Sequence, residues 1–464
     1  MNRLARLLLV LVVLGWAAPA RAGGYDTPML YSARHMGMGG SAIGWVNDPS
    51  ALFHNPAGLA QVRGLSLLGD FSPLIGTITA SPQGEPETTS IESNTTFAPF
   101  FLVGAGYRIT EWLAVGLAVY PVASAGATYE YDLDGEHITD HTKLVFIEAT
   151  PGFALQLPQN IRIGAGYRIN SVSLDRTRES ETEPDIDLAL SGMNFFSFRV
   201  GAQWQPIPEL EIGLVYRHKT VTDVSADTGT MLGLAITDIT YEFTLPTRLG
   251  FGARGNFGAL HAALDLEYGL NSQNDMATLR GTPPSGAEIP VPNYFEWKDA
   301  LTLRAGVEYR LMEDKIATRL GYIFDATTAN VQYPSAFGTP PGPTHVLTVG
   351  GGYDGGPWEV NLAYAYRFGT AEVTEDDIGP EACLLCGKPG DYAIGLHGIY
   401  VDFSIELFRP APPPPPDPNA DLVQPEPATS APGDGATTEP AATEPQTTEP
   451  ATTEPAATDP AATP

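Results

Sequence analysis

The segment Leu301-Thr302-Leu303-Arg304-Ala305-Gly306-Val307-Glu308-Tyr309-Arg310 alternates between apolar residues and polar or small ones at every step. Successive side chains of a β-strand point to opposite faces, so this segment predicts a strand with one apolar wall and one polar wall. The segments 259–268 and 359–368 repeat the pattern. We therefore expect a protein built from strands that are apolar on one side only.

Similar segments recur along the middle of the chain, and short turns alternate with longer polar connections between them. About 14 strands are expected, an even number, and the separation of short turns from long loops is typical of outer-membrane β-barrels. The expected strands are 63–79, 97–109, 112–131, 143–156, 161–176, 194–205, 210–226, 237–255, 259–271, 294–310, 315–327, 344–354, 358–370 and 392–408. The expected long loops are 80–96, 132–142, 177–193, 272–293 and 371–391.

The core of a soluble β-sandwich would produce the same alternation, but two further features favour a membrane barrel. Aromatic residues recur at strand ends, as in the interfacial girdle of a barrel. Glycine is abundant on the polar face, which suits close backbone approach. The fold class predicted from these patterns is all-β, a transmembrane antiparallel up-and-down β-barrel over residues 63–408. The strand-end aromatics are Tyr107, Tyr167, Tyr309, Tyr366 and Phe368.

The composition is consistent with this fold class. Hydrophobic residues make up 43% of the 464 residues and charged residues only 17%. Beyond the N-terminus, no stretch reaches the roughly 20 uncharged apolar residues that a membrane-spanning helix needs. The formal net charge of −29 argues against nucleic acid as a partner, because nucleic-acid binding depends on neutralising phosphates with Lys and Arg.

The two ends of the chain differ from its middle. Arg3 and Arg6 precede an apolar run up to Trp16, and Ala20-Arg21-Ala22 supplies small residues for cleavage, so residues 1–22 are expected to be a signal peptide. Residues 409–464 are rich in Pro, Thr, Glu and Ala, which predicts a disordered, extended and anionic periplasmic tail. A cell-wall or periplasmic partner for this tail is a hypothesis, and a plain spacer is the alternative.

The segment Asp48-Pro-Ser-Ala-Leu-Phe-His-Asn55-Pro56-Ala57-Gly58-Leu59-Ala60, preceded by the glycine-rich residues 34–42, resembles the N-terminal hatch of the FadL/TodX family of outer-membrane hydrocarbon and fatty acid channels. The residues 97–131 and 297–310 also resemble strands of this family. The resemblance covers residues 23–408. It implies that residues 23–62 form a hatch (plug) that includes Asn55, Pro56, Ala57 and Gly58. The alternative for these four residues is a simple Asx-Pro turn.

The same resemblance implies a kinked third strand that opens a lateral gap in the barrel wall. The residues themselves agree, because Pro121 lacks a backbone donor and Gly126 lies in the same expected strand. Proline and glycine inside a strand mark a bulge or a broken ladder. We therefore expect the lateral opening at Pro121 and Gly126, and an ordinary bulge without an opening is the alternative.

Several arginines are expected to face the lumen by parity, Arg367 among them. A luminal arginine can hold a fatty acid carboxylate through charge-assisted hydrogen bonds. The alternative is that these arginines pair with luminal acids such as Asp265, Glu267 and Glu308. The candidates for binding a ligand carboxylate are Arg199, Arg248, Arg304 and Arg319.

Cys383 and Cys386 are the only cysteines and lie in the last expected loop, where a local disulfide is the favoured interpretation. No metal, cofactor or catalytic residue is expected, and the protein is not expected to be an enzyme. An acyl hydrolase would need a Ser–His pair on one wall, and the sequence does not nominate one.

The resemblance implies passive uptake of hydrophobic small molecules, either long-chain fatty acids or aromatic and aliphatic hydrocarbons. A general porin or a structural barrel is the alternative. The better-known fatty acid transporters of the family carry longer, partly helical outer loops. The loops near 177–193 and 225–237 are short in comparison, which argues against an external site for fatty acids. Outer-membrane lipid, lipopolysaccharide and the barrel assembly machinery are the other expected partners, the last because residues 398–403 resemble a C-terminal assembly signal.

Overall fold

The computed structural model describes residues 30–82, 90–133, 135–180, 184–381 and 383–408. The expected signal peptide, the first residues of the expected hatch (23–29) and the expected tail (409–464) lie outside the described residues. Within the described ranges, no helix is long and apolar enough to span a membrane.

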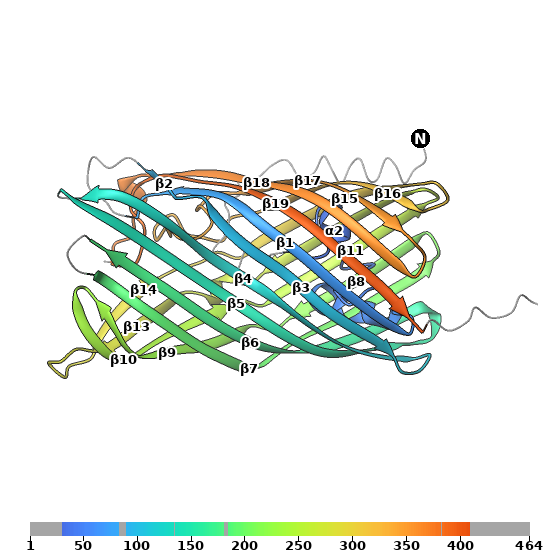
Figure 1. Ribbon diagram of the computed structural model, residues 1–464, viewed down its shortest axis with the longest axis horizontal. Coiled ribbons are helices and arrows are strands. Elements are labelled where there is room, and N and C mark those ends of the chain that lie inside the picture. The colour runs from blue at the N-terminus through green and yellow to red at the C-terminus, as the bar shows by residue number, and fades with distance from the viewer. Residues whose placement is uncertain (1–29, 83–89, 134, 181–183, 382, 409–464) are drawn as a thin grey trace, which may run out of the picture. The chain divides into compact units, whose positions relative to one another are not determined.

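The strands form one antiparallel sheet that closes on itself. Strand β1 (Leu65–Ala80) pairs on one side with β3 (Thr96–Arg108) and on the other with β19 (Gly390–Leu407). The result is a closed barrel of 14 strands, some of which are divided into two of the numbered strand elements. This confirms the predicted fold class, and Figure 1 shows the strands steeply tilted. The remaining elements are β2 (Ile91–Glu92), β4 (Leu113–Leu133), β5 (Glu136–Gln156), β6 (Ile161–Glu179), β7 (Pro184–Ile207), β8 (Leu210–Arg217), β9 (Thr220–Met231), β10 (Leu234–Leu245), β11 (Arg248–Phe257), β12 (Leu260–Gly269), β13 (Met276–Thr282), β14 (Ile289–Tyr294), β15 (Ala300–Leu311), β16 (Ile316–Asp325), β17 (Thr344–Asp354) and β18 (Trp358–Val373).

The alternation of strand β15 separates the outside of the barrel from its lumen. Leu301, Val307 and Tyr309 are exposed on the outer surface, whereas Arg304 and Glu308 are buried inside. The other strands repeat this arrangement, so the barrel carries an apolar and aromatic outer surface. Such an outer surface is stable against lipid hydrocarbon and costly in water.

Residues 30–62, which we call the N-terminal segment, lie inside the barrel, and Figure 1 shows helix α2 there. The segment comprises α2 (Ala33–Met36), α3 (Ala51–His54) and the 3-10 helix η1 (Pro56–Gln61). Nearly all of its residues are buried. Its helices contact strands on different sides of the barrel, α2 against β17–β19 and η1 against β4–β7.

The prediction of loops is wrong for several connections, because the strands continue through them. The expected loop 177–193 is largely the end of β6 and the start of β7, and 132–142, 225–237 and 272–293 likewise contain strand residues. On β7, Ile186 and Leu188 point inward and are buried, while Asp185 and Asp187 are exposed outside. The acidic residues of this segment were interpreted as a loop. A strand that faces water instead of lipid also carries charged residues on its outer face.

The expected strand 237–255 is also wrong as a single element. It divides into β10 and β11 around Pro246 and Thr247. Proline has no backbone N–H to donate to a ladder, so the strand is interrupted at that point.

Candidate functional site

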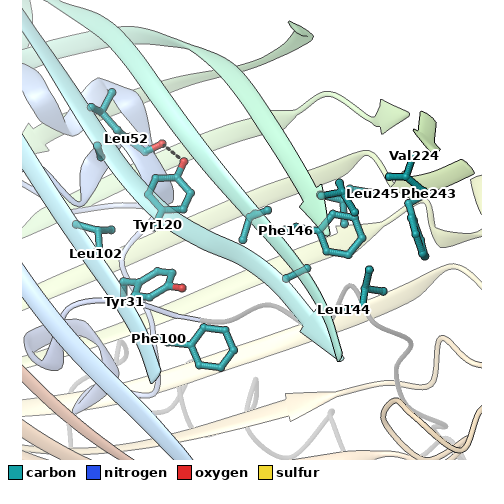
Figure 2. Close-up of a cluster of buried hydrophobic side chains, with 14 of the residues drawn as sticks. Tyr31, Leu52, Phe100, Leu102, Tyr120, Leu144, Phe146, Val224, Phe243 and Leu245 are labelled. Atoms are coloured by element: carbon teal, nitrogen blue, oxygen red, sulfur yellow. Dashed lines mark hydrogen bonds between the residues drawn. The ribbon is translucent and has the colours of Figure 1, made fainter. Parts of the chain in front are cut away.

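A cavity of about 620 Å³, the inner cavity, lies between the N-terminal segment and one side of the barrel wall. Its lining is mainly apolar and comes from the N-terminal segment, β1, β3–β6, β17–β19 and the connection between β16 and β17. Leu30 and Met36 form part of its wall on the side of the N-terminal segment. Figure 2 shows Phe100, one of the lining residues, beside Tyr31 of the N-terminal segment.

Backbone pairing between two neighbouring strands is interrupted beside the inner cavity. Strands β3 and β4 pair only between residues 103–108 and 114–119. Contact returns at Asn94, whose backbone N–H donates to the carbonyl of Thr128 at 2.8 Å. Between these points, the described residues 95–102 and 120–127 have no β3–β4 register partners. We call this unpaired stretch the wall gap.

Both residues predicted for a lateral opening lie beside the wall gap and line the inner cavity. The pairing of β4 with β5 shifts register between Pro121 and Ala123. Gly126 has a φ of 156°, and a Cβ atom there would lie 2.3 Å from the carbonyl oxygen of Thr142. The carbonyl of Pro121 accepts a hydrogen bond from the hydroxyl of Tyr31, so the N-terminal segment satisfies a backbone group at the kink.

The inner cavity is bordered by side chains from both faces of the wall beside the wall gap. Its lining includes Phe100, which is 5% exposed and points inward. It also includes Phe97, which is 59% exposed on the outside, and the outward-facing Ile147. A lateral opening at this place stays a prediction.

The residues predicted for the hatch tie the N-terminal segment together and to the barrel. The side chain of Asn55 accepts from the backbone N–H of Ala57 at 3.2 Å, as in an Asx turn. Its amide also donates to the carbonyls of Ile43 at 2.8 Å and of Ala202 in β7 at 3.0 Å. Pro56 begins η1, and a Cβ atom on Gly58 would lie 2.1 Å from the carbonyl oxygen of Val46. These residues therefore form the Asx-Pro turn and also contact the barrel wall, while their role as a hatch stays a prediction.

Luminal glycines let the backbone of the N-terminal segment lie directly against the wall. A Cβ atom on Gly306 of β15 would lie 2.2 Å from the carbonyl oxygen of Met38, and one on Gly321 of β16 would lie 2.0 Å from the nitrogen of Gly39. No side chain fits at such distances. The abundance of glycine on the polar face had indicated this close approach.

Buried carboxylates fix the N-terminal segment on two sides of the barrel. Asp265 of β12 accepts hydrogen bonds from the backbone N–H groups of Ala42 and Ile43 at 2.7 and 3.0 Å. Asp402 of β19 accepts from the Ser32 hydroxyl at 2.7 Å and from a backbone N–H two residues later. Hydrogen bonds to charged acceptors are the stronger kind, so these contacts hold the segment firmly.

Two buried histidines lie within the N-terminal segment. The Nε2 atom of His54 is 3.0 Å from the carbonyl oxygen of Tyr31, and His35 lies 3.5 Å from the carboxylate of Asp48. Burial lowers the pKa of His35, and it lowers the pKa of His54 well below its usual value. Both rings are therefore neutral near neutral pH.

The four arginines predicted to bind a ligand carboxylate are buried in the lumen, but none lines the inner cavity. Arg319 lies 2.7 Å from Glu308, and both Arg248 and Arg304 contact Glu267. Arg199 donates to the carbonyl of Leu52 at 2.6 Å and to the hydroxyl of Tyr120 at 3.2 Å; Figure 2 shows this hydroxyl bonded to Leu52. These contacts match the pairing alternative, and a role in ligand binding stays a prediction.

One arginine outside the predicted set does line the inner cavity. Arg367 of β18 borders it and forms a 2.7 Å ion pair with Asp325 of β16. Parity placed Arg367 in the lumen, but parity carries no information about height along the barrel. Only the stagger between strands decides which luminal charges reach the cavity.

A smaller cavity of about 150 Å³, the outer cavity, lies among the ends of the long hairpins. Leu188, Met231, Phe243 and Trp297 form part of its lining. Cys383 and Cys386 form a disulfide, the pairing that the sequence favoured, and Leu385 between them also lines the outer cavity.

A closed barrel with an apolar outer surface, an internal N-terminal segment and an apolar luminal cavity defines an outer-membrane transport barrel. The chain belongs to the family described as outer membrane protein transport protein (OMPP1/FadL/TodX), whose sequence profile matches residues 14–382. Family and fold together assign the protein to the outer membrane and to the transport of hydrophobic compounds. No curated protein matches the chain by sequence.

Solved structures agree on the fold at low sequence identity. A FadL homologue from Pseudomonas aeruginosa is 17% identical, with a TM-score of 0.64 over 83% of this chain and 100% of its own. The toluene transporter TodX from Pseudomonas putida is 16% identical, with a TM-score of 0.62 over 83% and 100%. The toluene transporter TbuX from Ralstonia pickettii is 17% identical, with a TM-score of 0.61 over 82% and 99%.

Proposed function

We propose that this protein takes up uncharged hydrophobic small molecules by diffusion through the inner cavity and releases them sideways through the wall gap. The observation that carries this proposal is the apolar inner cavity, which is bordered both by the luminal Phe100 and by the outward-facing Phe97. A hydrophobic molecule that leaves through the wall enters lipid and avoids the cost of crossing water.

The N-terminal segment serves as the hatch in this proposal. It is anchored through Asp265 on β12 and through Asp402 on β19, and its backbone packs against luminal glycines. Such packing leaves little room for a straight path along the barrel axis. A molecule in the inner cavity therefore finds its exit at the wall gap.

The pairing of Arg367 beside the inner cavity favours a neutral ligand over a carboxylate, and the other cation on its lining, Lys143, is exposed. Arg367 is already paired with Asp325, so a fatty acid would have to displace that partner. The inner cavity has the size of typical small-molecule sites. Two structural neighbours are named toluene transporters, and a single-ring aromatic hydrocarbon is the ligand we propose.

A long-chain fatty acid is the second candidate because Arg367 borders the cavity. A ligand carboxylate that displaced the Asp325 side chain would keep Arg367 paired. This candidate predicts that Asp325→Asn raises oleate uptake without changing toluene uptake. Uptake of both compounds should be compared in cells with and without the protein, and equal toluene uptake in both strains would refute the proposed function.

Lateral release is tested by filling the wall gap. Ala98 lines the inner cavity at this position, so Ala98→Trp should reduce toluene uptake strongly. The control is Ala105→Trp, on the same strand but inside its paired region and on its outward face. Equal uptake by both variants would contradict release through the gap. Sugar passage through the unmodified protein in liposomes would contradict the hatch and favour a general porin.

A further inference from the structure

The connection between β16 and β17 folds into the lumen instead of lying over the end of the barrel. Connecting loops normally run over the surface of a protein. Here Ala329, Ala336 and Thr339 are buried, and Tyr333 is only 6% exposed. Residues 326–343, which we call the inner loop, therefore occupy space that would otherwise belong to the passage.

The tip of the inner loop lies between the two cavities. Phe337, Gly338 and Thr339 line both the inner cavity and the outer cavity. Two wall residues, Ala125 of β4 and Thr142 of β5, also border both cavities. The Phe337 side chain is half-buried because it borders these hollow spaces on both sides. The Phe337 ring therefore lies at the boundary between the two cavities.

The ring of Phe337 is held by two side chains of the wall. Tyr129 of β4 meets it edge to face at 5.5 Å, and the Tyr129 hydroxyl donates to the carbonyl of Ala336. The guanidinium of Arg176 lies 4.7 Å from the ring centre and is itself paired with Asp140. Aromatic and cation–π contacts of this kind hold a ring in place without locking it there.

The inner loop is anchored more firmly before its tip. The backbone N–H groups of Gly379 and Gly387 donate to the carbonyls of Gln332 and Pro334 at 3.1 and 2.6 Å. Tyr333 also stacks on Tyr294 at 5.2 Å. The Phe337 ring can therefore change rotamer while the base of the loop stays in place.

We propose that the inner loop is a second gate and that Phe337 sets the size of the hydrophobic molecules that pass from the outer to the inner cavity. This gate rests on the proposed transport function but is separate from the hatch and the wall gap. A single-ring hydrocarbon passes after a small movement of the Phe337 ring. A two-ring hydrocarbon needs the ring to leave its place between Tyr129 and Arg176.

The first test measures uptake of toluene and biphenyl with Phe337 altered. We expect Phe337→Ala to raise biphenyl uptake relative to toluene uptake by about tenfold, equivalent to about 1.4 kcal/mol in the barrier. Phe337→Trp should lower the same ratio, and Tyr129→Phe, which keeps the ring but loses the bond to Ala336, should raise it slightly. The matched control is Phe196→Ala, because Phe196 is 86% exposed outside the barrel.

The second test needs no transport. Ala365 lines the inner cavity, so Ala365→Cys places a thiol behind the gate. In purified protein, detergent covers the wall gap, and a charged, water-soluble thiol reagent has to enter past Phe337. Addition of Phe337→Ala should speed labelling of this thiol by a similar factor, and Phe196→Ala should not.

The two tests separate the gate from the proposed function. Faster labelling in a protein that takes up no hydrocarbon would support the gate and refute transport. Toluene uptake with an unchanged biphenyl ratio and unchanged labelling would overturn the gate and leave transport standing.

Discussion

The lumen has two halves that the same alternating strands build in different ways. In the half near the short turns, luminal positions are glycine or paired charges, such as Gly321 and Glu308, and the N-terminal segment fills the space. In the half near the long hairpins, luminal positions are large and apolar, such as Phe146 and Phe243, and cavities remain. Small residues admit the backbone of the N-terminal segment directly against the wall, whereas large ones hold a backbone at a distance and leave cavities. We call these the filled half and the hollow half.

The largest effect is expected where charge is buried in the filled half. Glu308 pairs with Arg319 at 2.7 Å, Arg310 at 3.0 Å and Arg254 at 3.3 Å. Glu308→Gln removes the shared anion and should cost about 3–5 kcal/mol, because it leaves buried cations uncompensated. This loss is measured by gel electrophoresis of samples heated to increasing temperatures, as the temperature at which the band of the folded barrel disappears. Glu288→Gln, in an exposed pair, is the control.

A smaller loss of stability with a clear functional change is expected from Gly321→Val. The new side chain meets the nitrogen of Gly39 and should displace the N-terminal segment, at a cost of about 1–3 kcal/mol for overpacking. Sugars should then permeate liposomes that contain the variant. Gly351→Val is the control, because its nearest neighbour lies 3.6 Å away. If sugar stays excluded in both variants, the filled half is not what closes the barrel.

Tyr31→Phe tests the link between the two halves. It removes the hydroxyl that bonds to the Pro121 carbonyl, which should cost about 1 kcal/mol and make the wall gap more mobile. We expect a change in toluene uptake without sugar leakage. Tyr392→Phe loses a comparable bond, to the carbonyl of Lys388 in the hollow half, and should leave uptake unchanged. Equal uptake in both variants would show that the contact is only structural.

The smallest effect is expected from the disulfide in the hollow half. The double change Cys383→Ser and Cys386→Ser opens a ring of only a few residues, so the entropy it releases is small. The temperature of barrel unfolding should stay nearly unchanged, while Leu385 at the outer cavity becomes more mobile. A large drop in that temperature would mean that the hollow half carries more of the stability than its cavities suggest.

The sequence predicted the barrel well because alternation and turn residues are local properties. The alternation from Leu301 to Arg310 predicts the two faces of a strand without knowledge of its neighbours. The missing backbone donor of Pro121 is likewise known from the residue type alone. The acidic residues around Asp187 were misinterpreted because charge indicates contact with water, and a strand that extends beyond the membrane meets water too. Local rules therefore succeed for strands inside the membrane and fail at the hairpins beyond it.

The candidate site was predicted less completely because it depends on contacts between distant parts of the chain. Arg319 was placed in the lumen by parity, but its pairing with Glu308 required the register of β15 and β16. Phe337 lies in a stretch rich in proline and glycine, as ordinary surface loops do. Its position between Tyr129 and Arg176 follows only from how the closed sheet brings β4 and β6 to the same cavity.

The seam between β1 and β19 has a consequence for biogenesis. Met38 and Gly39 lie so close to β15 and β16 that no side chain would fit at Gly306 or Gly321, and β1 pairs with β19 to close the sheet around them. We expect residues 30–62 to dock before this last strand pairing forms. We expect the nascent sheet to wrap around its own beginning, with β1 and β19 zipping together as the final step.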